Sequence, residues 1–138
     1  MIKFQPHGAF KTRVEGRILV SDLHGPWNLE LVDKWMKVAH PLVKELAATG
    51  PHVHITIVTG SLLCPPDALD RLAAVIVYTT AHMRCIANIV VAAADVEGRA
   101  LFEPMYARIY EGSPPHALFL DVDSARAWAL ELLAEEGY

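Results

Sequence analysis

Apolar side chains recur along this chain with two different spacings, and segments of the two kinds alternate. Residues 10–15 alternate apolar and charged positions, which is typical of a strand with one face in water. Residues 17–23 are mostly apolar and follow directly after Gly16, so the two segments are predicted to pair as a hairpin. The charged positions indicate that residues 10–15 form an edge strand.

The next segment has the spacing of a long helix. Asn28 can accept the free N–H groups of a first turn, and apolar residues then recur every three or four positions as far as Leu46. Gly50 ends this pattern. Pro41 lies inside it, where it removes one backbone hydrogen bond, so we expect a kink or a break near His40.

The middle of the chain predicts two further strands around a helix. Residues 52–58 have the composition of a strand, and the turn at residues 59–61 leads to a helix that opens at Pro65 and Pro66. Residues 84–94 are apolar on both alternating faces, as in a parallel strand that is covered on both sides. We therefore expect residues 84–94 to be central in the sheet.

The last third predicts two helices around a short strand. A helix is expected from an Asp95 cap to about Tyr110, and residues 112–116 have the composition of a linker. A strand at residues 117–120 and a final helix capped by Asp123 complete the chain.

The element order is β-β-α-β-α-β-α-β-α. This order predicts a single α/β domain over residues 1–138, with a mixed, mostly parallel sheet of about five strands and covering helices. A chain of 138 residues with 53% apolar side chains is long enough and apolar enough to form a core without metals or disulfides.

Charge and composition exclude several classes of partner. The formal net charge is −4 and no Lys/Arg cluster is present, which argues against nucleic acids and anionic membrane surfaces. No apolar run reaches the ~18 residues of a membrane span, and the first residues do not resemble a secretion signal. We expect a cytoplasmic protein with no membrane span.

Cysteine and histidine positions are the main candidates for metal chemistry. Cys64 and Cys85 have no CxxC or Cys/His spacing, so both are interpreted as free thiols. His52 and His54 lie two apart on a predicted strand and share a face, but two ligands make an incomplete metal site. The alternative interpretation is a solvated strand start. We predict no metal and no cofactor.

The HGPWN loop before the first helix, the ending ALFLDVDSARAWALELL and the element order together resemble the SpoIIAA-like (STAS-like) superfamily of small bacterial proteins. The resemblance covers essentially the whole chain, and most relatives with these features have no assigned function. It implies the SpoIIAA-like fold and a non-enzymatic regulatory or protein-interaction module.

Regulatory members of that superfamily carry an Asp-Ser-Ser/Ala-Gly motif, with a phosphorylated serine, at the start of the second helix. This chain has Leu63-Cys64-Pro65-Pro66-Asp67 there instead, so the phosphorylation switch is not carried over to any residue, including the nearby Ser61. Strand ends of this kind are where α/β domains bind ligands and partners. The candidate ligand or partner site is accordingly the following group: Trp27, Ser61, Cys64 and Asp67.

Three classes of function remain open. The interaction module comes first, as a homodimer or with a partner protein. Binding of a small apolar or lipid-like ligand is the alternative, because the related CRAL-TRIO fold carries lipids and the helices here are rich in apolar residues. An enzyme comes last, because no acid/base pair, nucleophile motif or metal triad can be assembled and no catalytic residue is assigned.

The expected third helix is the candidate interface. It carries more large apolar groups than one buried stripe can hide, and such an excess indicates an interaction patch. The candidate interface residues, beside Leu101, are Phe102, Met105, Tyr106, Ile109 and Tyr110.

Overall fold

The sheet of the computed structural model, which describes residues 5–111 and 115–138, has five strands in sequence order. The strands are β1 (Ala9–Glu15), β2 (Ile18–His24), β3 (His52–Thr59), β4 (Cys85–Ala92) and β5 (His116–Phe119). β1 and β2 are antiparallel, and all later pairs are parallel. The predicted mixed, mostly parallel sheet is confirmed. Residues 112–114 of the predicted linker lie outside the described residues.

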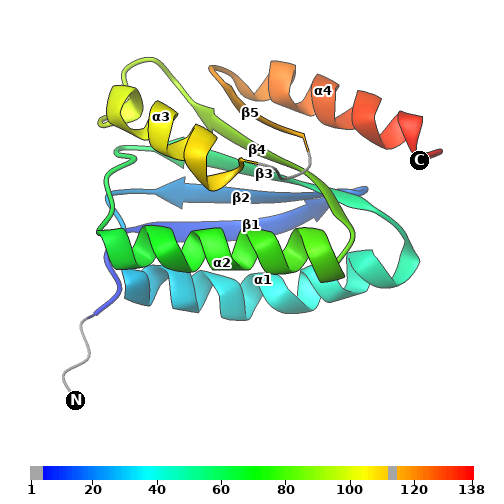
Figure 1. Cartoon of the computed structure of the whole chain (residues 1–138), viewed down its shortest axis with the longest axis horizontal. Coiled ribbons are helices and arrows are strands. Elements are labelled where there is room, and N and C mark those ends of the chain that lie inside the picture. The colour runs from blue at the N-terminus through cyan, green and yellow to red at the C-terminus, as the bar shows by residue number, and fades with distance from the viewer. Residues whose placement is uncertain (1–4, 112–114) are drawn as a thin grey trace.

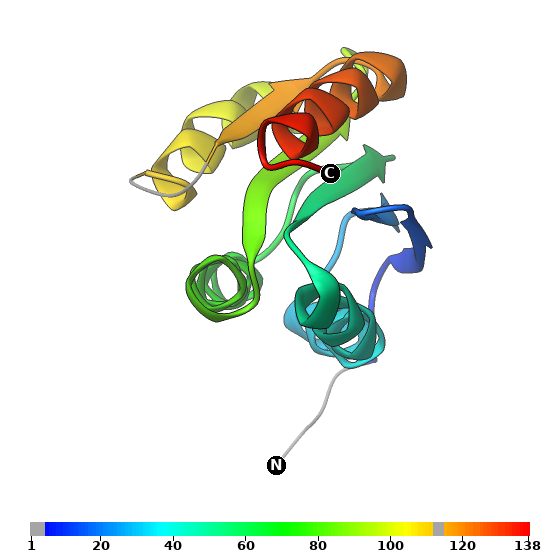
Figure 2. The same cartoon turned by 90° about the vertical axis from the view of Figure 1, so that its right-hand side faces the viewer.

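Helices cover both faces of this sheet (Figure 1). They are α1 (Leu29–Thr49), α2 (Pro66–His82), α3 (Arg99–Ile109) and α4 (Val122–Glu135). Buried side chains of α1, α2 and α3 form one apolar cluster with one face of the sheet, whereas α4 packs on the opposite face. Figure 2 shows α1 and α2 end-on on one side and α4 on the other. The result is a three-layer α/β domain.

The layers follow from the strand order. Each parallel strand from β3 to β5 is added on the same side of the strand before it. Right-handed crossovers in one direction bring every connecting helix to the same face, which accounts for α1, α2 and α3. α4 follows the last strand, has no further strand to connect, and covers the face that the crossovers leave bare.

The N-terminal hairpin is confirmed, with β1 at the edge of the sheet. Gly16 sits in the turn with a φ of +58°, a conformation that glycine adopts at little cost. The edge carries charge pairs, because the Arg13 guanidinium donates to Asp22 at 2.6 Å and Arg126 of α4 donates to Glu15 at 2.9 Å. These charges guard the edge against open-ended strand pairing.

α1 begins at the predicted cap, where the Asn28 side chain accepts a hydrogen bond from the backbone N–H of Leu31 at 3.0 Å. The helix runs without a break through Pro41, so the expected break did not occur. Pro41 and Lys37 are exposed, and the Lys37 carbonyl that loses its partner can bond to water instead.

Two predicted caps are wrong. α3 begins at Arg99 with Gly98 as its cap, not at Asp95, because residues 93–98 form a loop that pairs with the segment after β3: Leu62 N–H donates to the Glu97 carbonyl at 2.8 Å. α4 is capped by Asp121 rather than Asp123, since the Asp121 side chain accepts from the Ser124 N–H.

The strand predicted to be central is covered on both sides. Seven of the eight residues of β4 are buried, and only Ile86 is partly exposed. By order, however, β3 is the middle strand and β4 is second from the β5 edge. Within the described residues, no helix is both long enough and apolar enough to cross a membrane.

Candidate functional site

A cavity of about 310 Å³ lies between the sheet and the helices α1, α2 and α3. Its walls are mainly apolar, with Trp35 and Val43 from α1, Ile76 from α2 and Phe102 from α3. The lining also includes three exposed residues on α1 and α2: His40, Ala74 and Tyr78. Because these residues reach solvent, we place the mouth of the cavity between α1 and α2.

Four polar side chains, which we call the polar floor, lie among apolar side chains on the strands that line the cavity. Ser21, Thr56, His54 and Asn88 come from three neighbouring strands and all line the cavity. Ser21 pairs in register with Thr56, and His54 with Asn88. The indole N–H of Trp35 donates to Ser21 Oγ at 3.0 Å, so part of this floor is satisfied within the chain.

Two hydrogen-bond donors in the cavity lining have no partner. Trp27 is 3% exposed and Asn88 is 4% exposed, and both line the cavity. Trp27 Nε1 and Asn88 Nδ2 are buried without a hydrogen bond among the described residues. Leaving a buried donor unsatisfied costs about 1–3 kcal/mol. Both atoms have almost no exposed surface, so an acceptor in the cavity reaches them only after a small movement of the side chain.

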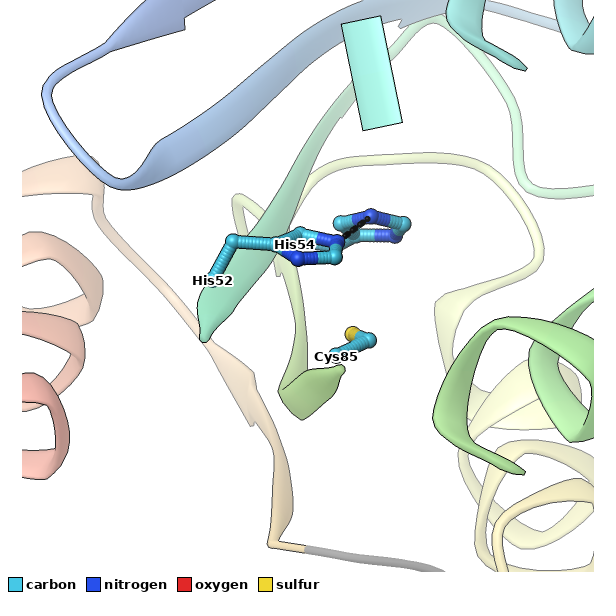
Figure 3. A group of neighbouring side chains, drawn as sticks. All are labelled: His52, His54 and Cys85. Atoms are coloured by element: carbon cyan, nitrogen blue, oxygen red, sulfur yellow. Dashed lines mark hydrogen bonds between the residues drawn. The ribbon is translucent and has the colours of Figure 1, made fainter. Parts of the chain in front are cut away.

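A cluster of three metal-ligating side chains adjoins the polar floor (Figure 3). His52 Nε2 and His54 Nε2 are 2.9 Å apart and share a hydrogen bond. The ligating atoms of both histidines and of Cys85 all lie within 4.8 Å of one another. His52 and Cys85 are buried, whereas His54 is half-buried because it borders the cavity.

The register of β3 and β4 brings this cluster together. His52 pairs with Cys85 at the start of both strands, and an irregularity then makes Val53 pair with Ala87. Ile86 is the extra residue of this bulge, which lets Cys85 and Asn88 project from the same face of β4. Figure 3 shows Cys85 on the neighbouring strand, beside the two imidazole rings.

Burial sets the protonation of the cluster. Loss of solvent lowers the pKa of His52 and of His54, and the nearby Arg17 and His52, respectively, lower them further, so both rings are neutral at pH 7. Burial raises the pKa of the Cys85 thiol to about 12, although hydrogen bonds partly offset this. Neutral imidazoles are the form in which histidine binds metals.

The interpretation of the two histidines as a solvated strand start is wrong for His52, which has 0% of its surface exposed. Cys85 was predicted only to be a free thiol, not a member of a metal-ligating group. A signal was present, because His52 opens one predicted strand, Cys85 is the second residue of another, and the two strands are predicted to be parallel. That signal identifies a cluster only if β3 and β4 are known to be neighbours.

The predicted ligand or partner site is only partly assembled. Trp27 and Cys64 line a shallow hollow beside the HGPWN loop, and Ser61 and Asp67 are not part of its lining. Ser61 is buried, and its hydroxyl accepts a hydrogen bond from the Leu63 N–H at 3.1 Å. Asp67 is exposed and accepts from the N–H of Ala68.

Cys64 is a poor nucleophile in this setting. It is half-buried at the start of α2, where burial and the nearby Asp67 raise the pKa of its thiol to about 11. The thiol therefore stays protonated at neutral pH. Both cysteines are free, as predicted.

The predicted interface on α3 requires correction. Phe102, Tyr106 and Tyr110 form the buried stripe of this helix and belong to the core of the chain, so they are not a free surface. The Tyr106 hydroxyl donates to the carbonyls of Asn88 and Ala117. Met105 and Ile109 are half-buried beside the exposed Leu101. The homodimer itself stays a prediction.

No family model, curated protein or solved structure was found to match this chain in three separate comparisons. The resemblance to the SpoIIAA-like superfamily therefore stays a prediction, and the site is interpreted from its own geometry.

Proposed function

We propose that this protein binds a small, mostly apolar ligand in the cavity between the sheet and α1, α2 and α3. One observation carries the proposal: the cavity of about 310 Å³ has apolar walls, yet two buried donors in its lining have no partner. A volume of this size is at the lower end of small-molecule sites, which are largely apolar with a few placed polar groups.

The unpaired groups define the ligand further. Trp27 Nε1 and Asn88 Nδ2 are donors, so the ligand carries a hydrogen-bond acceptor such as a carbonyl. The cavity walls provide no charged side chain for an ionic head group within the described lining. A neutral, lipid-like molecule with an oxygen acceptor fits these features best.

The test is a titration with 2-decanone, an apolar chain with one carbonyl acceptor. Trp27 and Trp35 line the cavity, so binding should change the tryptophan fluorescence and saturate at one molecule per chain. Ala39→Leu enlarges a buried residue of the lining and should weaken binding about tenfold or more, or about 1.4 kcal/mol.

The matched control is Ala48→Leu, which adds the same side chain at an exposed position on the same helix. It should bind as the parent does. If the parent shows no saturable change, the proposal is wrong for this class of ligand. Equal binding by Ala39→Leu and the parent would place the ligand elsewhere. The interaction module implied by the resemblance is the competing proposal.

A further inference from the structure

The cluster of His52, His54 and Cys85 combines borderline and soft ligands without a carboxylate. The group that these three residues form within the described chain contains no Asp or Glu. Imidazole and thiolate suit zinc and copper, whereas magnesium and calcium require oxygen ligands. The chemistry of the cluster is therefore that of a transition-metal site.

His52 is the most buried member of the cluster. Its side chain is fully buried. Its ring makes one hydrogen bond, which joins His52 Nε2 to His54 Nε2. His52 Nδ1 has no hydrogen-bond partner among the described residues. Because the two Nε2 atoms face each other, they are the nitrogen atoms of the cluster that can share an ion.

We propose that His52, His54 and Cys85 bind a single copper(I) ion. Copper(I) with one thiolate and two neutral imidazoles is a complex with no net charge, which can be buried at little electrostatic cost. Zinc in the same three ligands would leave one positive charge in the interior. Arg17 lies close enough to His52 for its charge to disfavour a cation there, which adds to the cost for zinc.

Binding requires small movements and a defined transfer of protons. The two Nε2 atoms, 2.9 Å apart, must separate slightly to place the ion between them, and the Cys85 side chain must rotate toward them. Cys85 releases its thiol proton to solvent, and the proton shared by the two Nε2 atoms moves to Nδ1 of the same ring. Because His54 borders the cavity, the ion can enter through the cavity mouth.

The test is a copper(I) titration under anaerobic, reducing conditions, in competition with the chromogenic chelator bicinchoninate. The key variant is Cys64→Ser, which leaves Cys85 as the single cysteine of the chain. The parent and Cys64→Ser should each bind one copper(I) per chain with the same affinity. Failure of Cys64→Ser to bind copper(I) would overturn the proposal without requiring Cys85 to be changed.

Ligand variants complete the test. Cys85→Ser and His54→Gln should each weaken copper(I) binding by roughly a hundredfold or more, since even outer-shell partners of metal sites account for 10–100-fold. His54→Gln keeps a polar side chain at a half-buried position, so it remains informative if Cys85→Ser does not fold. His82→Gln removes an exposed histidine outside the cluster and should bind as the parent does. Unchanged affinity in His54→Gln, or zinc bound more tightly than copper(I), would contradict the proposal. The copper(I) proposal does not depend on the proposed apolar ligand, so each proposal can be contradicted without the other.

Discussion

Single side chains connect parts of this fold that the sequence separates. Arg17, in the turn between β1 and β2, donates to the carbonyls of Leu46 and Pro51 and to Thr49 Oγ1, and it lies over the Tyr138 ring. One guanidinium thus satisfies the end of α1 and the segment that follows. The guanidinium of arginine holds its donors in a rigid planar fork, so one side chain can donate to three acceptors in fixed directions.

Arg17→Ala should lower the free energy of unfolding by about 2 kcal/mol, because several partly buried acceptors lose a charged donor. Arg17→Lys should recover only part of this loss. The measurement is urea denaturation. The control is Arg71→Ala, which removes an exposed ion pair with Asp33 and should cost less than about 1 kcal/mol. If Arg17→Ala and Arg71→Ala lower the free energy of unfolding equally, the hydrogen bonds of Arg17 contribute no more than an exposed ion pair.

Glu15 predicts a small acid sensitivity. A hydrogen bond from Arg126, together with the charges of Arg126 and Arg13, holds the pKa of Glu15 below its ordinary value of 4.5. As the pH falls, Glu15 is therefore protonated in the unfolded chain before it is protonated in the folded chain. The stabilisation is complete above about pH 4.5 and is lost as the pH falls through the lower folded value.

Glu15→Gln should accordingly be less stable than the parent at pH 7, by less than about 1 kcal/mol because the pair is partly exposed. The difference should shrink toward zero in strong acid. Stability curves against pH check this, with Glu131→Gln, on the exposed face of the same helix as Arg126, as control. A difference that stays constant with pH would exclude the ion pair as its cause.

At the scale of elements, α3 shows how burial redistributes an apolar surface. Phe102, Tyr106 and Tyr110 recur every four residues and face the core, and Leu101, Met105 and Ile109 form the adjacent stripe. The apolar excess in the sequence thus covers two stripes. One stripe is buried in the core of the chain, and in the other only Leu101 is strongly exposed.

Phe102→Glu should therefore destabilise the protein by about 3 kcal/mol or more, since it removes a buried ring and buries a charge. Leu101→Glu should leave stability within about 0.5 kcal/mol of the parent, as expected of a surface change. Thermal melts measure both. Sedimentation of Leu101→Glu then tests the homodimer prediction on a folded variant. A monomeric parent would remove that prediction.

At the scale of the whole molecule, the two faces of the sheet are packed differently. The α4 face is closed by small side chains, with Ala125 and Ala129 fully buried against β3 and β4. The opposite face contains the cavity and the polar floor. Added volume should therefore have opposite effects on the two faces.

Ala39→Leu should stabilise the protein by about 1 kcal/mol, because Ala39 lines the cavity and the new methyl groups gain contacts there. Ala125→Leu makes the same change on the packed face and should cost about 1–3 kcal/mol. Urea denaturation of both variants beside the parent is the measurement. A loss of stability in Ala39→Leu equal to that in Ala125→Leu would mean that the cavity is too small to accept a side chain.

Much of the fold was predictable because it depends on local patterns. The hairpin, the Asn28 cap, the apolar β4 and the element order all follow from spacing, turn residues and capping chemistry that act within a few residues. The right-handed crossover adds the parallel pairing. The corrected caps at Asp95 and Asp123 mark where this reasoning ends, since a chemically good cap is used only if the neighbouring loop permits it.

The candidate sites were decided by tertiary structure. His52 and Cys85 are 33 positions apart in the sequence, and they meet because β3 and β4 are neighbours and a bulge turns Cys85 and Asn88 to one face. The cavity arises where three helices from different parts of the chain fail to fill the space above polar strand residues. The sequence determined which segments are strands and helices and which faces are apolar. Which polar side chains share an interior space was decided by the tertiary structure alone, because long-range packing carries no periodic signal.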